Sequence, residues 1–302
     1  MDSKVSETKS INRMTVGEAF TSSGATLAPF TELMSNVDWP VSGDGISDRW
    51  KFVALVKSTS GNEAIRNYDG YDTKRNRVVC IRISRLSDKR QLLKTEAKIL
   101  EKNVTVVAGS AHGLRLCDFG NWSCFQYLVF KQCGPSLHQL RRQMQSRSFT
   151  EETIVRVAVQ CVEAIRDLHR IGYVHRNVRP MVFHIGSEPK SLRTIFLTDF
   201  DVAKRYLDKN GNHKPYKGRI GFRGSTFYAS INSHEKKELS RRDDLWSLFY
   251  VIIEMFKGWL PWKQIYNRET ALKLKQYYTP EKLCEALPPQ FRKIVKHLRS
   301  LK

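Results

Sequence analysis

The sequence predicts an α+β fold in which a smaller β-rich part precedes a larger helical part. Three observations lead to this prediction. Short apolar runs bounded by turn residues follow one another between residues 50 and 130, as strands do. Residues 150–171 carry apolar side chains at helical spacing, and residues 245–256 are apolar on nearly every side. Because the strands are grouped before the helices, two segregated parts are expected rather than alternating βα units.

The charge of the chain is large and unevenly spread. The 302 residues carry a net charge of +21, whereas the first 49 residues sum to −3, so the remainder carries +24. A positive field of this size favours anionic partners, such as acidic or phosphorylated protein segments, nucleic acid or anionic lipid. The plainer interpretation, that the charge serves only solubility, stays open.

Cysteine usage and hydropathy bear on the compartment. Six cysteines stand in apolar surroundings without a Cys-x-x-Cys pair, which argues against a zinc site and for reduced thiols. No signal peptide is evident, and the most apolar run, residues 245–256, falls short of the ~20 residues that span a bilayer. We therefore expect a cytoplasmic or nuclear protein with no membrane segment.

The domain organisation follows from composition. Residues 1–46 are rich in Ser, Thr, Asn and Gly and show little periodicity, so they are expected to form a disordered tail. The folded domain is predicted at residues 47–302. The expected strands lie within about residues 47–131, and the long helical segments lie within about residues 132–302.

The predicted elements follow in order. Strands are expected at residues 50–57, 63–69, 78–83, 114–120 and 125–130, with a turn around Gly61 between the first two. A helix is expected at residues 88–102. A longer one spans residues 150–171, with Thr150 as its N-cap and Gly172 at its end. The loop Tyr173–Pro180 comes next, and a further strand ends at Asp199.

Several segments together resemble the casein kinase I superfamily of protein kinases, and within it the tau-tubulin kinases. The resemblance covers about residues 48–302. It is carried by the loop containing His175, Arg176 and Asn177, and by four later segments: Gly221–Gly224, Tyr228–Ser230, Arg242–Tyr250 and Leu260–Trp262. It implies a two-lobed protein kinase fold with a small β-rich N-lobe and a larger helical C-lobe. It also implies an ATP cleft and protein serine/threonine substrates.

The resemblance assigns roles to individual positions. It places the catalytic base at Asn177, the lysine of the catalytic loop at Arg179, and the lysine of the N-lobe at Arg82. Glu96 is the expected ion-pair partner of Arg82. The two metal-ligand positions fall on Asp199 and Val182.

The remaining implied roles concern the nucleotide cleft and the frame of the catalytic loop. Gly61 is the one glycine left of the phosphate-covering loop, Phe130 lies at the back of the cleft, and main-chain groups around Gln132 face the adenine. His175 and Arg176 are structural, and Asp243 ties the catalytic loop backbone. Without the resemblance, the segment at Gly61 is an ordinary hairpin, the segment at Gln132 is a linker, and Asp199 is a turn residue.

The substitutions point away from phosphoryl transfer. Asn177 has no carboxylate to accept a proton from a substrate hydroxyl group, and Val182 offers no oxygen to a metal ion. Arg82 and Arg179 keep the positive charge but are longer and forked. The prediction is a catalytically inactive kinase homologue, or pseudokinase, that acts as a protein-binding scaffold or regulator in signalling. No cofactor is expected, although ATP and Mg²⁺ remain possible.

Two alternatives stay open. One is a weak or atypical serine/threonine kinase that uses Asp199, and the other is a nucleic-acid-binding module, for which the sequence shows no recognition motif. The expected partners are acidic or phosphorylated protein segments, because arginine forks match phosphate groups. The candidate residues for such an anion site are Lys214, Lys217, Arg219, Arg223, Arg241 and Arg242.

Overall fold

A computed structural model describes residues 38–56, 63–105, 111–145, 148–285 and 287–301 of the chain. Most of the predicted tail lies outside these residues, and so does the turn containing Gly61. In the described part of the chain, no helix has the length and apolar character needed to cross a bilayer.

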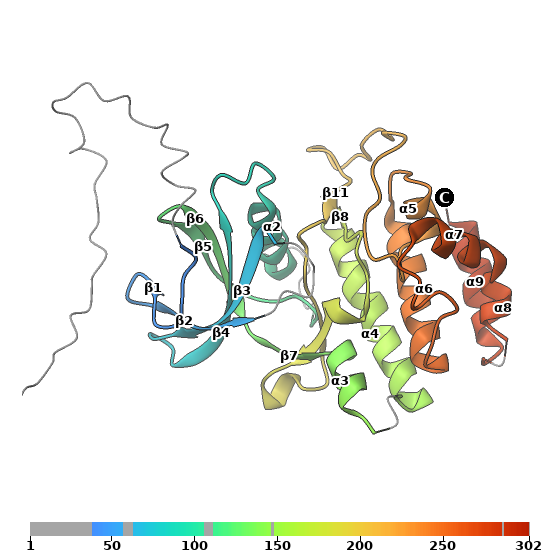
Figure 1. The fold of residues 1–302 in the computed structure, drawn as a ribbon, viewed down its shortest axis with the longest axis horizontal. Coiled ribbons are helices and arrows are strands. Elements are labelled where there is room, and N and C mark those ends of the chain that lie inside the picture. The colour runs from blue at the N-terminus through green and yellow to red at the C-terminus, as the bar shows by residue number, and fades with distance from the viewer. Residues whose placement is uncertain (1–37, 57–62, 106–110, 146–147, 286, 302) are drawn as a thin grey trace, which may run out of the picture. The chain divides into compact units, whose positions relative to one another are not determined.

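The N-lobe is built on an antiparallel sheet of six strands in the order β1-β2-β3-β4-β6-β5, with helix α2 (Leu92–Thr105) packed against β4, β5 and β6 (Figure 1). Buried and exposed side chains alternate at the start of β2, whereas four consecutive residues of β4, Ile81–Ser84, are buried. Their bounds are β1 Gly45–Ile46, β2 Trp50–Val56, β3 Ile65–Asp72, β4 Arg77–Arg85, β5 Leu116–Trp122 and β6 Phe125–Lys131.

The folded part begins before the predicted boundary at residue 47. Strand β1 pairs with β2, and the ring of Trp39 lies 5.2 Å from that of Phe125. The guanidinium of Arg66 also stacks on Trp39 at 4.3 Å. Because Trp39 contributes aromatic and cation–π contacts, the compact unit extends to this residue. Composition could not predict this earlier start, because Trp39 is a single aromatic residue among residues that favour turns.

Helix α2 begins four residues later than predicted. The side chain of Asp88 accepts a hydrogen bond from the backbone N–H of Arg90 at 3.0 Å, and Gln91 has φ = 48°. An aspartate that bonds to the backbone two residues ahead stabilises a turn in place of a helix, which explains the late start.

The C-lobe combines seven helices of the described residues with two small sheets. One sheet has the order β10-β9-β7, and the other pairs β11 with β8. The strands are β7 Cys133–Ser136, β8 Tyr173–Val174, β9 Phe183–Gly186, β10 Ile195–Leu197 and β11 Lys204–Arg205, and short 3₁₀ turns cover Pro180–Val182 and Pro189–Ser191. The helices are α3 Leu137–Gln143, α4 Glu151–Arg170, α5 Ile231–His234, α6 Arg241–Lys257, α7 Arg268–Tyr277, α8 Pro280–Leu283 and α9 Gln290–Ser300.

Helix α4 has the ends that the sequence predicts. The Oγ1 atom of Thr150 accepts a hydrogen bond from the backbone N–H of Thr153 at 3.3 Å. After Ile171 the chain turns at Gly172, whose φ is +87°. A Cβ atom at Gly172 would also lie 3.0 Å from the side chain of Leu207, so both backbone conformation and packing favour glycine.

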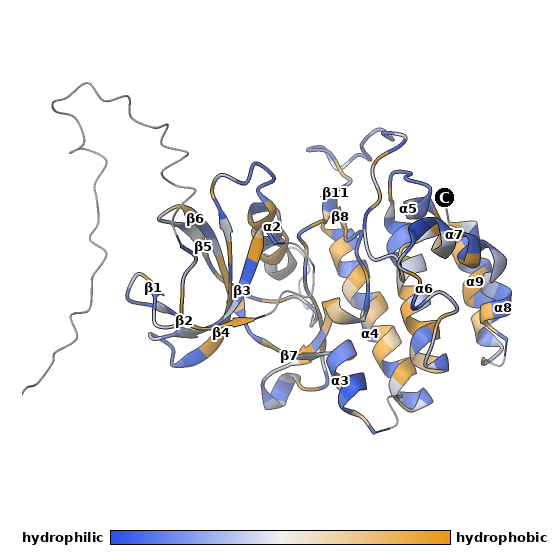
Figure 2. Ribbon diagram, viewed as in Figure 1, coloured by the Kyte–Doolittle hydropathy of each residue, from blue (hydrophilic) through white to orange (hydrophobic). Residues whose placement is uncertain are grey.

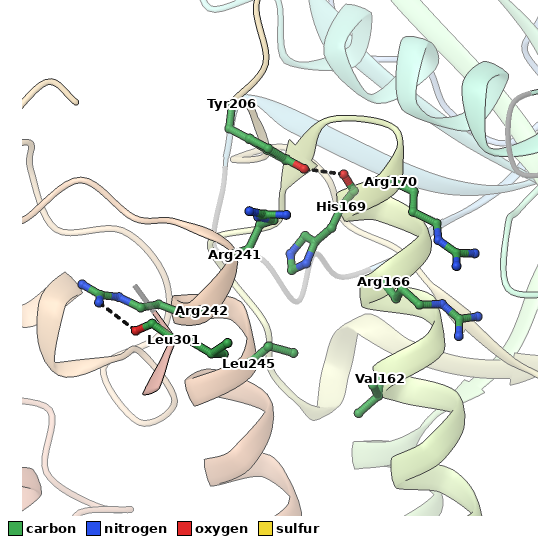
Figure 3. Close-up of a pocket in the computed structure, with 9 residues that line it drawn as sticks. All are labelled: Val162, Arg166, His169, Arg170, Tyr206, Arg241, Arg242, Leu245 and Leu301. Carbon is green, nitrogen blue, oxygen red and sulfur yellow. Dashed lines mark hydrogen bonds between the residues drawn. The ribbon is translucent and has the colours of Figure 1, made fainter. Parts of the chain in front are cut away.

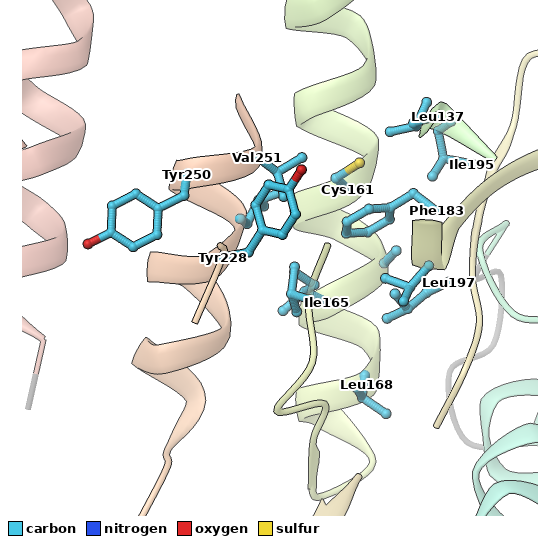
Figure 4. Packing of buried hydrophobic residues seen from close by; sticks show 14 of the residues in the cluster. Leu137, Cys161, Ile165, Leu168, Phe183, Ile195, Leu197, Tyr228, Tyr250 and Val251 are labelled. Carbon is cyan, nitrogen blue, oxygen red and sulfur yellow. The ribbon is translucent and has the colours of Figure 1, made fainter. Parts of the chain in front are cut away.

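The core of the C-lobe lies where α4 packs against α6 and β10. Hydrophobic residues of α4 and α6 form orange stretches along both helices in Figure 2. Figure 4 shows Cys161 and Ile165 of α4 between Val251 of α6 and Phe183 of β9. Each such large side chain contributes about 1.5–3 kcal/mol when it is removed from water. The predicted burial of the 245–256 helix and the two-lobed fold are therefore confirmed.

The side chain of Lys275 is buried inside this lobe. The side chain of Lys275 is 1% exposed, and its Nζ donates hydrogen bonds to the carbonyl oxygens of Thr226 (2.9 Å) and Ala229 (2.7 Å). The Nε2 atom of His234 lies 3.1 Å away. Burial lowers the pKa of Lys275 well below its usual value. Burial and the neighbouring Lys275 lower the pKa of His234 to about 4.

The titration of His234 gives a testable pH dependence. Histidine in an unfolded chain has a pKa of about 6.5. Between about pH 6.5 and 4, His234 therefore binds a proton in the unfolded chain but stays neutral in the folded chain. The contribution of His234 to the free energy of unfolding is complete above about pH 6.5. It is lost as the pH falls, and the total loss is at most about 3 kcal/mol. The variant His234→Gln should therefore lose less stability between pH 7 and pH 5 than the original chain, as measured by urea unfolding.

The matched control for this experiment is His297→Gln, on the exposed side of α9. It should keep the pH dependence of the original chain. An unchanged pH slope in His234→Gln would contradict the assignment.

Candidate functional site

The loop after α4 is held by one buried carboxylate. The Oδ2 atom of Asp244 accepts a hydrogen bond from the backbone N–H of His175 at 2.7 Å, and its Oδ1 accepts from that of Arg176 at 2.7 Å. Its Oδ2 also lies 2.9 Å from His169 Nε2. Burial favours the neutral acid, but His169, His175 and these N–H groups keep the pKa of Asp244 below its usual value.

The prediction that Asp243 ties this loop is wrong. The Oδ1 atom of Asp243 instead accepts hydrogen bonds from Ser230 Oγ (2.8 Å) and Asn232 Nδ2 (2.9 Å), and its Oδ2 caps the start of α6 at the N–H of Ser240 (2.8 Å). Adjacent residues of a helix point about 100° apart, so only the second of the two aspartates faces the loop.

The expected structural roles of His175 and Arg176 fit their contacts. His175 is fully buried, and its Nε2 lies 3.0 Å from the carbonyl oxygen of Thr198. Arg176, with φ = 66°, donates from Nε to the carbonyl oxygen of Val202 at 2.7 Å. These two hydrogen bonds tie the loop to Thr198 and Val202, which flank Asp199 in the sequence. The loop and the segment that contains Asp199 are therefore held together.

Asn177 lies half-buried on this rigid loop, where the resemblance places the base. Gly224 packs closely against it: a Cβ atom at Gly224 would lie 2.9 Å from the carbonyl oxygen of Arg176. The loop backbone is therefore as tightly positioned as a reacting group would need. The functional group at its tip, however, is an amide that accepts no proton at neutral pH.

Four charged side chains meet where the lobes face each other. Arg82 Nη1 donates to both oxygens of Glu96, at 2.6 and 2.8 Å, so the predicted Arg82–Glu96 pair is confirmed. Arg82 Nη2 donates to Asp199 Oδ1 at 3.2 Å, and Arg179 Nη2 donates to Asp199 Oδ2 at 2.9 Å. The Arg82 and Glu96 side chains are 4% and 2% exposed. We call these four residues the arginine–carboxylate cluster.

Arg82 and Asp199 keep their charges despite burial, whereas burial disfavours the charge of Glu96. Burial lowers the pKa of Arg82, but Glu96 and Asp199 outweigh this effect and raise it. For Asp199, burial raises the pKa, and Arg82 with Arg179 more than reverses the rise, so the net shift is downward. Burial raises the pKa of Glu96 to about 7 against the opposing attraction of Arg82.

The residues present do not fit a magnesium ion. Mg²⁺ needs oxygen ligands, and the two carboxylate oxygens of Asp199 already accept hydrogen bonds from two arginines. The second ligand position, Val182, is a fully buried hydrocarbon. Among the described residues, no group of three or more histidine, cysteine or acidic side chains forms a metal site. A cation that binds Asp199 would first have to displace the guanidinium groups of Arg82 and Arg179.

A cleft of about 530 Å³ nevertheless lies between the lobes, with a volume in the range of small-molecule pockets. Phe130 lines it, as predicted. Gln132 lines it too. The side-chain amide of Gln132 donates a hydrogen bond to Asp69 at 2.7 Å, and the main-chain carbonyl oxygen of Gln132 accepts one from Ser187 Oγ at 2.7 Å. The main-chain acceptor expected to face an adenine is therefore already hydrogen-bonded within the protein.

Other side chains of the cleft were not predicted. His184 lies in it with Nδ1 2.9 Å from the carbonyl oxygen of Gly134, and burial lowers its pKa. Burial also raises the pKa of Cys80 and of Cys133 to about 12, so both thiols stay protonated at neutral pH. None of these residues belongs to a motif, which is why sequence reasoning passed over them.

The six predicted anion-binding residues do not form one cluster. Lys214 and Lys217 line one cavity together with Arg241, whereas Arg242 lines a second cavity that shares Arg241. Arg223 lies instead beside Arg176; burial and the charge of Arg223 lower the pKa of Arg176 to about 10. Arg219 forms an isolated β-bridge with Lys237.

Removing Arg82 should reveal how strongly the cluster depends on it. Arg82→Met leaves Glu96 buried without its cation, and breaking a buried pair from one side costs about 3–5 kcal/mol. The double variant Arg82→Met/Glu96→Leu should recover most of that loss, because Arg179 still pairs with Asp199. Urea unfolding at pH 7 gives both values.

The exposed Arg156–Glu152 pair of α4 supplies the control. Arg156→Met should cost less than about 1 kcal/mol. If the double variant at Arg82 and Glu96 were no more stable than Arg82→Met alone, the charge balance described for the cluster would be wrong.

Comparison with known proteins agrees with this geometry. Residues 61–301 match the family described as "Protein kinase domain". A relative named "Probable serine/threonine-protein kinase", from Dictyostelium discoideum, is 34% identical over 275 residues, which is 89% of this chain and 52% of that protein. "Casein kinase I homolog 2" of Schizosaccharomyces pombe is 29% identical over 242 residues, which is 78% of this chain and 54% of that protein.

The chain thus spans about half the length of these two relatives. The family match covers most of the sequence, from shortly before β3 of the N-lobe to the end of α9. With the two-lobed fold and the Asp244-anchored loop, it leads to one conclusion: this chain belongs to the protein kinase domain family.

Proposed function

We propose that this chain is a pseudokinase of the casein kinase I type, close to the tau-tubulin kinases, that works by binding other proteins. The observation that carries the proposal is the double engagement of Asp199 by Arg82 and Arg179. The oxygens that would hold a metal ion are neutralised by fixed cations of the chain. Phosphoryl transfer depends on metal ions to offset the charge of the phosphates.

The second support is the loss of the proton acceptor. Asn177 stands on a loop whose backbone is tied to Asp244 by two hydrogen bonds, and its own side chain is an amide that accepts no proton at neutral pH. Base catalysis alone contributes about 10²–10⁴-fold. The second metal ligand is also lost, at Val182, and the two losses together need not equal the sum of the single effects, because residues that act as a unit are not additive.

A binding role is the use of the fold that remains. The described part of the chain keeps a rigid core, and the strongly positive field lies on it rather than on the N-terminal residues. Acidic or phosphorylated protein segments are the partners that this field attracts. The basic residues expected to contribute are Lys214, Lys217, Arg219, Arg223, Arg241 and Arg242.

A second candidate function is a weak serine/threonine kinase. The relatives are named as kinases, and the chain retains Asp199, Glu96 and an ordered catalytic-loop backbone. Incubation of the purified chain with ATP labelled at the γ-phosphate, Mg²⁺ or Mn²⁺, and a protein substrate decides between the two. We expect no incorporation above background. Incorporation that disappears in Asp199→Ala would establish the kinase instead.

Nucleotide binding is tested by thermal unfolding with ATP and Mg²⁺. A ligand that binds the folded state raises Tm. Since we propose that the original chain does not bind ATP with Mg²⁺, we expect no increase in its Tm. The variant Arg82→Lys/Asn177→Asp/Arg179→Lys/Val182→Asn introduces two lysines, a carboxylate and a second metal ligand. It should gain an increase that requires Mg²⁺.

Two controls make this result interpretable. ATP with EDTA separates metal-dependent from metal-independent binding. The same four-residue variant carrying Asp199→Asn should lose the gain. A clear rise in Tm of the original chain with ATP and Mg²⁺ would contradict the proposed displacement of the metal.

A further inference from the structure

A basic cavity lies on the C-lobe between β11, the chain that follows it and the start of α6. Its volume is about 230 Å³. We call it the hairpin pocket, because the chain that follows β11 folds back on itself there. This volume is below the about 300–1,000 Å³ of sites for drug-sized ligands, so the pocket suits one side chain or a small molecule. It is lined by residues 204–206, 213–217 and 238–241 and by Val174 of β8.

Hydrogen bonds within the chain hold the walls of the pocket. The N–H of Tyr206 donates to the carbonyl oxygen of Gly172 at 2.9 Å, and the N–H of Lys214 donates to that of Tyr206 at 2.9 Å. The N–H of Asp208 donates to the carbonyl oxygen of Asn212 at 2.8 Å, which closes the hairpin. Because the backbone around the pocket is already ordered, little entropy is lost there when a ligand binds.

Three cations of the lining have no carboxylate partner. In the described part of the chain, Arg205, Lys214 and Arg241 form no ion pair. Arg205 Nη2 donates instead to the carbonyl oxygen of Asp208 at 2.9 Å, and Lys214 Nζ donates to that of Arg205 at 3.0 Å. Among the same described residues, Arg205 Nε has no hydrogen-bond partner. Cations gathered around one cavity without carboxylates attract an anion into it.

The acidic side chain of the lining, Glu238, is already engaged. Its Oε1 pairs with Lys204 Nζ, and its Oε2 accepts a hydrogen bond from the backbone N–H of Lys217. Burial raises the pKa of Glu238, but Lys204 and Lys217 more than reverse this effect, so the net shift is downward. Glu238 therefore stays ionised beside its own lysine, which offsets its repulsion of an incoming anion.

An aromatic ring fixes the position of Arg241. Figure 3 shows the guanidinium of Arg241 beside the ring of Tyr206, 5.3 Å from its centroid. The Tyr206 hydroxyl group donates to the carbonyl oxygen of His169 at 2.7 Å, which holds the ring in place. The ring of His213 meets that of Tyr206 edge-on at 5.4 Å. A stacked arginine loses less entropy when it binds an anion.

The rest of the lining offers apolar surface. Val174 and Leu239 are 1% and 7% exposed, so they contribute buried hydrocarbon to the cavity. Tyr216 is 68% exposed, and Pro215 precedes it in the lining. An exposed ring and aliphatic side chains beside three cations fit a ligand that joins an anionic group to an apolar ring.

We propose that the hairpin pocket binds a phosphotyrosine side chain of a partner protein. The phosphoryl group lies among Arg205, Lys214 and Arg241. The phenyl ring packs against Tyr216 and Leu239. A phosphoryl group carries a charge of about −1.5 to −2 and three acceptor oxygens, which suits several cations better than a single carboxylate does. The inference rests on the proposed binding function and gives it a site and a partner chemistry.

Phosphoserine and nucleic acid fit the pocket less well. The side chain of phosphoserine has no ring, so it would leave the apolar part of the lining in contact with water. A nucleic acid strand carries a row of phosphates, and its bases stack on exposed aromatic faces. Tyr206 is covered by Arg241, which leaves Tyr216 as the exposed tyrosine of the lining. One small cavity with one exposed ring suits a single aryl phosphate rather than a strand.

Fluorescence anisotropy with a defined probe tests the proposal. The probe is a short labelled peptide with a central phosphotyrosine between alanine and serine residues. At physiological salt it should bind at least about tenfold more tightly than the same peptide with tyrosine, and at least about fivefold more tightly than the same peptide with phosphoserine. Lys214→Glu/Arg241→Glu should weaken binding of the phosphotyrosine peptide by about tenfold or more, because two attractive charges become repulsive.

Matched variants separate the pocket from the overall charge. Lys273→Glu/Lys296→Glu makes the same change in net charge at exposed positions outside the lining, and should alter the affinity by less than about twofold. Tyr216→Ser should weaken binding of the phosphotyrosine peptide and leave that of the phosphoserine peptide unchanged. Tyr266→Ser, at an exposed tyrosine outside the lining, should change neither. Circular dichroism of each variant confirms folding.

Four results would overturn the proposal. Equal binding of the tyrosine peptide would exclude recognition of phosphate, and equal binding of the phosphoserine peptide would exclude recognition of the ring. An equal loss in the outside pair of charge variants would exclude this pocket. Displacement of the probe by an equimolar oligouridylate RNA would assign the pocket to nucleic acid. Phosphate transfer from labelled ATP is measured on the same preparations. Transfer by the original chain would end the pseudokinase proposal and leave the binding result standing.

Discussion

The arginine–carboxylate cluster is the interaction on which the site depends. Two arginines and two carboxyl groups are buried together, and each carboxyl group accepts hydrogen bonds from an arginine. The attraction between Arg82 and Glu96 is joined by two bonds from arginines to Asp199. Moving single ions out of water costs several kcal/mol each, so such a group is stable only when every member has its partners. This requirement also fixes α2 against β4, because Glu96 and Arg82 come from these elements.

Much of the fold and part of the site could be predicted from the sequence. Hydrophobic periodicity placed α4 and the buried helix near residue 250, since burial in a helix leaves a regular pattern. The Arg82–Glu96 pair followed from the family resemblance. The bonds of Asp199 did not, because the resemblance assigns partners by position. The reach of a guanidinium group toward a carboxylate 117 or 20 residues away is a property of the folded chain.

Two further differences have equally specific causes. Asp243 and Asp244 are adjacent and chemically identical, so a motif cannot say which one faces the catalytic loop; helix rotation decides it. The predicted anion-binding residues were grouped by nearness in sequence, whereas in the structure Arg241 and Arg242 line a cavity to which Arg166 and Arg170 of α4 also contribute. The spacing of four between the last two was visible in the sequence, but only packing shows which helix face stays exposed.

The cluster also joins the lobes. Arg82 and Glu96 belong to the N-lobe, Arg179 and Asp199 to the C-lobe, and the bond from Arg82 to Asp199 crosses the cleft. An active kinase must separate its lobes in every catalytic cycle to release product. A buried bond between the lobes would have to break each time, which would slow product release. In the pseudokinase that we propose, no product leaves this cleft, so the bond between the lobes can persist and hold the two lobes in a fixed arrangement.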